Sequence, residues 1–226
     1  MLTTDPATRD FVGLTSTDRT GIRHLPGLDG LRGLAVLVVV AFHAGFENMV
    51  GGYLGVSTFF TLSGFLITSL LLNEADRTGS VAVRSFWGRR FRRLLPAALA
   101  TLAAVVLLFT PFVATADQRA SMRGNVLASL FDVANWHDII KGNSYADLFT
   151  APSPVLHFWS LSIEEQFYVV FPILLLGIWI ATRGRRGLLA ATLGTLAIFS
   201  VLEPFVFSMS DDRVYFGTDT RAAELL

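Results

Sequence analysis

Cysteine is absent from the 226 residues of this chain, which excludes disulfide bonds and thiolate metal sites. Charge is also sparse, since 16% of the residues are charged against about 25% in soluble domains. The 18 basic and 18 acidic residues give a formal net charge of zero, so there is no basic field to attract a nucleic acid. Hydrophobic residues make up 52% of the chain, and this composition indicates a polytopic membrane protein.

Several well-known motifs are missing too. No HExxH zinc motif, P-loop, GxGxxG fingerprint or EF-hand loop occurs, and we predict no metal site. The glycines of "GLDGLRG" (27–33) recur at every third residue, which is not the dinucleotide spacing. The first 26 residues lack the basic, apolar and small-residue regions of a signal peptide. We expect residues 1–26 to form a flexible tail.

Apolar runs that could each cross a bilayer, about 20 residues long, recur along the chain. They predict an all-α bundle of transmembrane helices surrounded by membrane lipids. A sixth run opens near residue 214, so we expect five to six helices here and a longer protein of which this chain is the first half. The five complete runs lie near 31–50, 53–72, 94–116, 158–181 and 188–207.

The basic residues predict an orientation for this bundle. Thirteen of the 18 lysines and arginines fall in the tail to Arg32, the loop 73–96 and the loop 182–187, which alternation places on one side. The positive-inside rule makes that side cytoplasmic, so we expect a multi-pass cell-membrane protein with a cytoplasmic N-terminus. The segment 117–157 then lies outside. Its stretch 125–140 has helical apolar spacing, typical of an amphipathic surface helix or of a helix that caps the bundle.

Two polar residues share one face of the first predicted helix. Arg32 and His43 are 11 positions apart, which leaves them about 20° apart around the helix axis and about 16 Å apart along it. One interpretation is a positive-inside anchor together with a histidine that bonds a neighbouring helix. Polar groups inside a membrane span are nonetheless candidates for function, so Arg32 and His43 are also catalytic candidates.

Small and hydroxyl residues gather in the second apolar run, in "GVSTFFTLSGFLIT" (55–68). Ser57, Ser63 and Gly64 belong to this stretch. Such residues let helices approach closely and hydrogen bond to one another; alternatively, they form the polar lining of a channel beside His43. We do not expect Ser63 to be a nucleophile, because no G-x-S-x-G elbow surrounds it.

Arginines dominate "RSFWGRRFRRLLPA" (84–97), just before a helix that we expect to begin near Pro96. Such clusters usually fix the topology and contact lipid headgroups. The alternative is a phosphate site, because guanidinium groups bind phosphate oxygens in a bidentate way. The arginines of that predicted site are Arg89, Arg90, Arg92 and Arg93.

Two adjacent acids, Glu164 and Glu165, lie in "HFWSLSIEEQFYVVFP" (157–172), in the outer third of a predicted span. A buried carboxyl group is either protonated or paired with a cation, and we expect Glu164 to lie at the depth of His43. A carboxylate that orients an imidazole is a common general-base arrangement. The alternative is an interfacial aromatic belt with acids that reach the lipid headgroups.

Taken in order, these motifs resemble the membrane acyltransferase-3 family of bacterial O-acyltransferases, over roughly residues 25–226. The resemblance implies about ten transmembrane helices, of which residues 27–226 would be the N-terminal part. It also implies an enzyme that moves an acyl group, often acetyl, from cytoplasmic acyl-CoA to a hydroxyl of a carbohydrate, glycolipid or related acceptor of the cell envelope or secondary metabolism. The stretches that carry it are "LDGLRGLAVLVVVAFH", "GVSTFFTLSGFLIT", "RRFRRLLPA", "HFWSLSIEEQFYVVFP" and "VYFGTDTRAAELL".

Carried onto this chain, the resemblance implies that the family's Arg–His pair is Arg32 and His43 and that its acidic position is Glu164. Its basic loop falls on residues 89–93. Many relatives have an aspartate where this chain has Ser57, so this protein would perform the task of that aspartate differently.

These expectations combine into one mechanism. Acyl-CoA binds from the cytoplasm at Arg32 and the arginines of 89–93, and its pantetheine arm passes Ser63 and Gly64. His43 then acts as a general base or as a covalent acyl carrier, and Glu164 orients it. A proton-coupled transporter that uses the same groups and a purely structural subunit are the competing hypotheses. The predicted acceptor contacts are Ser57, Trp159, Glu165 and Tyr168.

Overall fold

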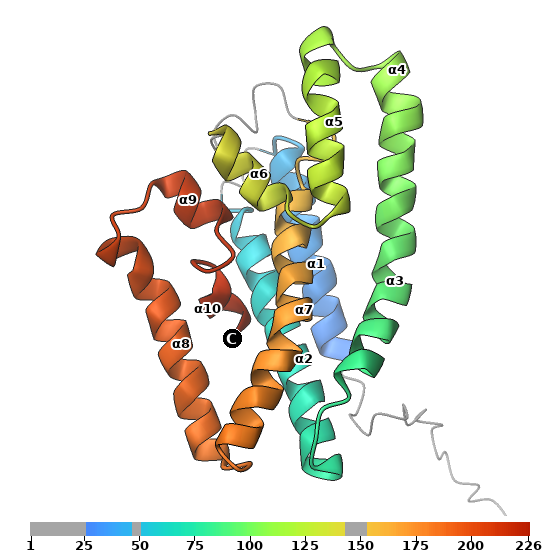
Figure 1. Cartoon of the computed structure of the whole chain (residues 1–226). Helices are drawn as coiled ribbons and strands as arrows, with labels where there is room; N and C mark the ends of the chain where they lie inside the picture. Colours follow the sequence, from blue (N-terminus) through green and yellow to red (C-terminus); the bar gives the residue numbers. More distant parts are fainter. Residues whose placement is uncertain (1–25, 47–50, 143–152) are drawn as a thin grey trace, which may run out of the picture.

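The computed structural model describes residues 26–46, 51–142 and 153–226, and this part of the chain is helical and contains no strand (Figure 1). Nearly all of the predicted tail lies outside the described residues. Five of the described helices are long and apolar enough to cross a membrane, which confirms the predicted all-α transmembrane bundle. They are α1 (Pro26–His43), α2 (Leu54–Thr78), α3 (Val83–Ala104) with its continuation through a π-helical turn (Val105–Phe109) and α4 (Thr110–Phe112), α7 (Phe158–Ala181) and α8 (Arg186–Val206).

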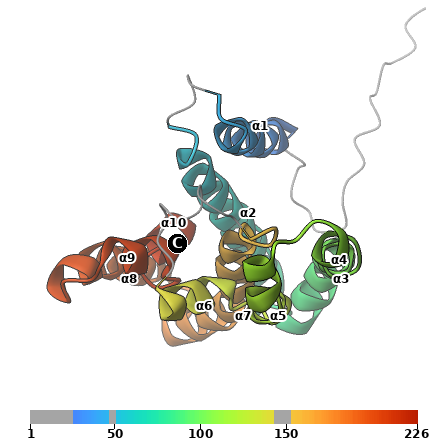
Figure 2. The ribbon, with the colours of Figure 1, turned by 90° about the horizontal axis from the view of Figure 1, so that it is seen from above.

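Helices α2 and α7 lie at the centre of the bundle, with α3 on one side and α8 on the other (Figure 2). Ile163 and Leu175 of α7 are fully buried, and they belong to one apolar cluster with Phe60 and Leu71 of α2. Apolar side chains also cover the outside of the bundle; Phe205 of α8 is 79% exposed. In water such a surface would be unfavourable, so these faces are suited to contact with lipid.

Helix α3 begins at Val83, and the prediction that it begins near Pro96 is wrong because this proline lies inside the helix. Arginine is a good helix former, so the helix extends beyond the apolar run and through the arginines. The segment 73–96, predicted as a loop, is therefore helical apart from the short turn between α2 and α3. The basic residues of this segment consequently occupy fixed faces of a helix.

Two helices, α5 (Ala116–Leu130) and α6 (Ala134–Lys141), replace the single helix that the stretch 125–140 predicts. They are separated at Asp132, whose φ of 52° lies in the left-handed region. Helix α6 packs on α7, and the backbone N–H of Ala134 donates to Ser162 Oγ at 3.2 Å. This packing supports a helix that caps the bundle.

Residues 211–226 do not form the start of a sixth long helix, which the apolar run near residue 214 predicts. They form α9 (Asp211–Phe216) and α10 (Ala222–Leu225), and α10 contacts both α2 and α8 (Figure 1). Arg213 donates to both carboxylate oxygens of Asp219, at 2.8 and 2.5 Å. Ser200 of α8 donates to the backbone oxygen of Asp219 at 2.5 Å. These bonds hold the segment against the bundle.

Helix α10 meets α2 at Gly64, where an added Cβ atom would lie 2.0 Å from the backbone oxygen of Leu225. We expect Gly64→Ala to lower the free energy of unfolding by about 1–3 kcal/mol, the usual cost of overpacking. The measurement is the unfolding temperature of the detergent-solubilised protein. Gly194→Ala on α8 is the matched control, because a Cβ there meets nothing within 4 Å. Equal unfolding temperatures for the two variants would contradict this packing.

Candidate active site

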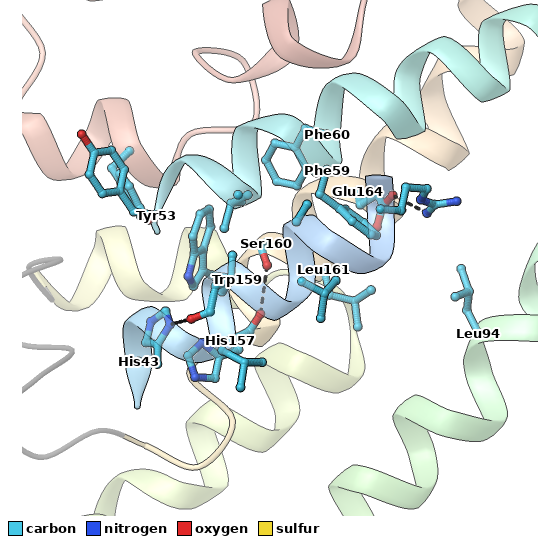
Figure 3. Close-up of a pocket in the computed structure, with 18 of the residues that line it drawn as sticks. His43, Tyr53, Phe59, Phe60, Leu94, His157, Trp159, Ser160, Leu161 and Glu164 are labelled. Carbon is cyan, nitrogen blue, oxygen red and sulfur yellow. Dashed lines mark hydrogen bonds and ion pairs between the residues drawn. The ribbon is translucent and has the colours of Figure 1, made fainter. Parts of the chain in front are cut away.

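A cavity of about 540 Å³ is lined by residues of α1, α2, α3 and α7, of the turns beside them, and by Tyr215 of α9 (Figure 3). His43 and His157 lie at one end, called here the histidine end. Arg32, Glu164 and Arg90 lie at the other, the arginine end. The wall between them is largely apolar. It includes Val36, Val39, Val56, Phe59, Trp159 and Leu161.

Helices α1 and α7 run in opposite directions, and this determines which residues meet across the cavity. His43 is the last residue of α1 and His157 directly precedes α7. Their ring centroids are 4.6 Å apart and the rings are nearly perpendicular, at 86°. Arg32 lies three turns earlier on α1, and its Nη2 is 4.0 Å from Glu164 Oε1.

The prediction that Glu164 lies at the depth of His43 is therefore wrong. Helix α1 ends at His43 instead of running to residue 50, so this histidine stands at a helix end. Glu164 lies about 10 Å beyond His157 along α7, since seven residues make about two turns. Figure 3 shows His43 and Glu164 at opposite ends of the cavity. Arg32 occupies the place beside Glu164 that was predicted for His43.

The backbone of α1 fixes the tautomer of His43, whose Nδ1 lies 2.8 Å from the carbonyl oxygen of Val39. Because a carbonyl oxygen only accepts hydrogen bonds, Nδ1 carries the hydrogen and Nε2 is the basic nitrogen of the neutral ring. The neighbouring His157 lies outside the span of α7. Its pKa is lowered by partial burial and by the nearby His43. A positive charge on the His43 ring thus disfavours a proton on His157.

His157 was not among the predicted site residues, although it begins one of the quoted motifs. The predicted topology contained a signal for it, because the end of the first span and the start of the fourth lie on the same side of the membrane. The contact between particular residues depended on where α1 ends and where α7 begins. Hydropathy does not determine such helix ends to within one turn.

A hydrogen-bonded cluster forms the arginine end. Arg32 Nη2 donates to Ser63 Oγ at 3.2 Å. The Tyr168 hydroxyl donates to Glu164 Oε1, and Arg90 Nη2 donates to the Tyr168 oxygen. The guanidinium carbon of Arg90 also lies 3.9 Å from the centre of the Tyr168 ring. The cation beside the buried Glu164 is thus Arg32 and not the predicted His43.

The structure separates the four arginines predicted to bind phosphate. Arg90 and Arg93 line the cavity, and three residues apart on α3 they share one face. Arg89 and Arg92 are exposed and are not among its lining residues. Half of the predicted arginine cluster therefore faces the cavity.

The predicted acceptor contacts are divided between several places. Trp159 lines the cavity. Ser57 instead accepts a hydrogen bond from Arg221 at 3.3 Å, and Arg221 is paired with Glu224 at 3.0 Å. Glu165 lines a second cavity of about 630 Å³ on another face of α7. Its Oε1 has no hydrogen-bond partner among the described residues.

Comparison with known proteins identifies the family, because the model of an acyltransferase domain matches residues 25–216. The chain belongs to the acyltransferase-3 family. This confirms the resemblance seen in the motifs, and the match covers Arg32, His43 and Glu164 as well as the arginines of α3. No solved structure matches this acyltransferase-3 chain significantly.

Curated relatives share more than two fifths of the aligned residues. A Staphylococcus aureus (strain COL) protein assigned as an O-acetyltransferase is 42% identical over 207 residues, which is 91% of this chain and 34% of the relative. Peptidoglycan O-acetyltransferase OatA of Listeria monocytogenes is 41% identical over 212 residues, 93% of this chain and 34% of OatA. YrhL of Bacillus subtilis, assigned as a peptidoglycan O-acetyltransferase, is 43% identical over 208 residues, 90% of this chain and 32% of YrhL. The chain thus spans about a third of the length of these relatives.

Proposed function

We propose that this chain supplies the donor site and the catalytic histidine of a membrane O-acyltransferase, which moves an acetyl or related acyl group from acyl-CoA to a hydroxyl of a cell-wall carbohydrate. The observation that carries the proposal is a single cavity with arginines at one end and paired histidines at the other. Family membership supports the reaction class. The name of the relative OatA, a peptidoglycan O-acetyltransferase, supports the acceptor class.

The donor enters at the arginine end, which the positive-inside rule makes cytoplasmic. Arg90 and Arg93 face the cavity and bind the phosphates of CoA through charge-assisted hydrogen bonds. The thin pantetheine arm then lies along the apolar wall. It carries the thioester towards His43, about 16 Å from Arg32 along the axis of α1.

At the histidine end, His43 is the general base. Its Nε2 takes the proton from the acceptor hydroxyl, the hydroxyl oxygen attacks the thioester carbonyl carbon, and the carbon–sulfur bond breaks with its electron pair on sulfur. The hydrogen bond from Nδ1 to Val39 keeps Nε2 basic throughout. Glu164 does not orient His43 in this scheme; it holds Arg32 and Tyr168 in place.

The two faces of α3 provide the test of the donor site. We expect Arg90→Ala/Arg93→Ala to raise the KM for acetyl-CoA by about 100-fold or more, since each charged hydrogen bond contributes roughly 1.5–3 kcal/mol and about 1.4 kcal/mol corresponds to a tenfold change. The matched control is Arg89→Ala/Arg92→Ala, which removes the same charge from residues that do not line the cavity. The measurement is acetyl transfer in membranes that contain the intact protein.

Equal KM values for the two double variants would contradict the proposed donor site. Proton-coupled substrate flux that requires no acyl-CoA would contradict the proposed acyltransferase activity. It would support the alternative of a transporter that uses the same histidine, glutamate and arginine groups.

A further inference from the structure

We propose that His157 is the second proton-transfer residue of this site: it receives the proton that His43 removes from the acceptor hydroxyl and releases it to the solvent beyond the histidine end. The inference rests on the proposed function and extends it to a residue for which neither the motifs nor the relatives provide a role.

The two rings are brought together by the ends of two membrane spans. His43 closes α1, and His157 stands at the start of α7. The backbone around His157 is fixed, because Ser160 Oγ donates to the His157 carbonyl oxygen at 3.2 Å and the N–H of Phe158 donates to Val155 at 3.0 Å. With ring centroids 4.6 Å apart, a small rotation of one ring or a single bridging water suffices to pass a proton.

The other groups near the pair are poorer proton acceptors. Among the described lining residues, Glu164 is the one carboxylate, and it lies at the arginine end beside Arg32. Tyr53 and Tyr215 also line the cavity, but a neutral phenol oxygen is a much weaker proton acceptor than an imidazole nitrogen. The imidazole of His157 is therefore the basic group best placed to take a proton from His43.

Burial and the neighbouring His43 lower the pKa of His157, so its ring is neutral and able to accept a proton when the reaction begins. His157 is also partly exposed, which gives the proton a path to solvent. In this reaction the O–H bond of the acceptor and the C–S bond of the thioester break, and a C–O bond forms between the acceptor oxygen and the acyl carbon. The proton passes from His43 to His157 and out, and CoA leaves as a thiolate that is protonated by water.

The test measures acetyl transfer by the intact protein from acetyl-CoA to a soluble N-acetylglucosamine oligosaccharide. We expect His157→Ala to lower kcat by about 10- to 100-fold and to leave the KM for acetyl-CoA unchanged. This loss in kcat is smaller than the largest losses, about 10⁴-fold, that follow removal of a direct general base. Imidazole added to the buffer should restore much of the rate, because a small base can replace a missing proton carrier. His157→Gln fills the site without titrating and should show the same loss, but imidazole should restore its rate less because the glutamine side chain occupies the space.

His137→Ala is the matched control, since this histidine belongs to α6 and does not line the cavity; it should keep the normal rate. A normal rate for His157→Ala would overturn the relay. A slow His157→Ala variant that imidazole does not restore would overturn it too and would indicate a purely structural role. Absence of acetyl transfer by the unaltered protein would refute the proposed function, and the relay with it.

Discussion

His43→Ala is expected to lower acyl transfer by about 10²- to 10⁴-fold, the range for loss of a positioned general base. The KM for acyl-CoA should change little, because Arg90 and Arg93 lie at the opposite end of the cavity. The measurement is the rate of labelled acetyl transfer, normalised to the amount of protein in the membrane. A loss in kcat with a constant KM would separate the chemical step from donor binding.

His43→Gln decides between a chemical and a structural role for this side chain. The glutamine amide can still donate a hydrogen bond to the Val39 carbonyl oxygen, as Nδ1 of the histidine does, but it cannot accept a proton at neutral pH. We expect the same loss of transfer as for alanine. Normal activity in the glutamine variant would mean that His43 only stabilises the end of α1, and it would remove the base from the proposed mechanism.

The transmembrane helices could be predicted from the sequence because a bilayer imposes a length and an apolar composition on each span. Their ends could not. The predicted start of α3 followed the apolar run to Pro96, whereas the helix begins at Val83, because arginine continues a helix as well as leucine does. Hydropathy reports where a helix lies in lipid, and not where its hydrogen bonding begins.

The same limit explains what could be predicted of the site. Arg32 and His43 share a face because the helical period is constant, so their relation needed only the sequence. The relation of His43 to Glu164 also depended on the end of α1 and the start of α7. An error of about two turns in depth exchanged the partners: Arg32 lies beside Glu164, and His157 lies beside His43.

Glu164→Ala is expected to cost about 3–5 kcal/mol of unfolding free energy, because removing one partner leaves a buried charge uncompensated. The Arg32 and Glu164 side chains are 15% and 7% exposed, with Nη2 and Oε1 4.0 Å apart. Tyr168 would also lose the carboxylate to which it donates. The measurement is unfolding in detergent, together with a double-mutant cycle with Arg32→Ala. If the two residues form an ion pair, the double variant should lose less than the sum of the single losses.

Glu165 provides the control, because the two adjacent glutamates are equally buried, each 6% exposed when the whole residue is counted, but differ in their partners. Glu165 Oε1 lacks a hydrogen-bond partner among the described residues, so Glu165→Ala removes a carboxyl group whose burial is already unfavourable. We expect this variant to be as stable as the unaltered protein or more stable. Equal losses for the two alanine variants would mean that the pairing with Arg32 contributes nothing. A loss confined to Glu164 would place the stabilising charge pair at the arginine end of the cavity, where the donor site is proposed.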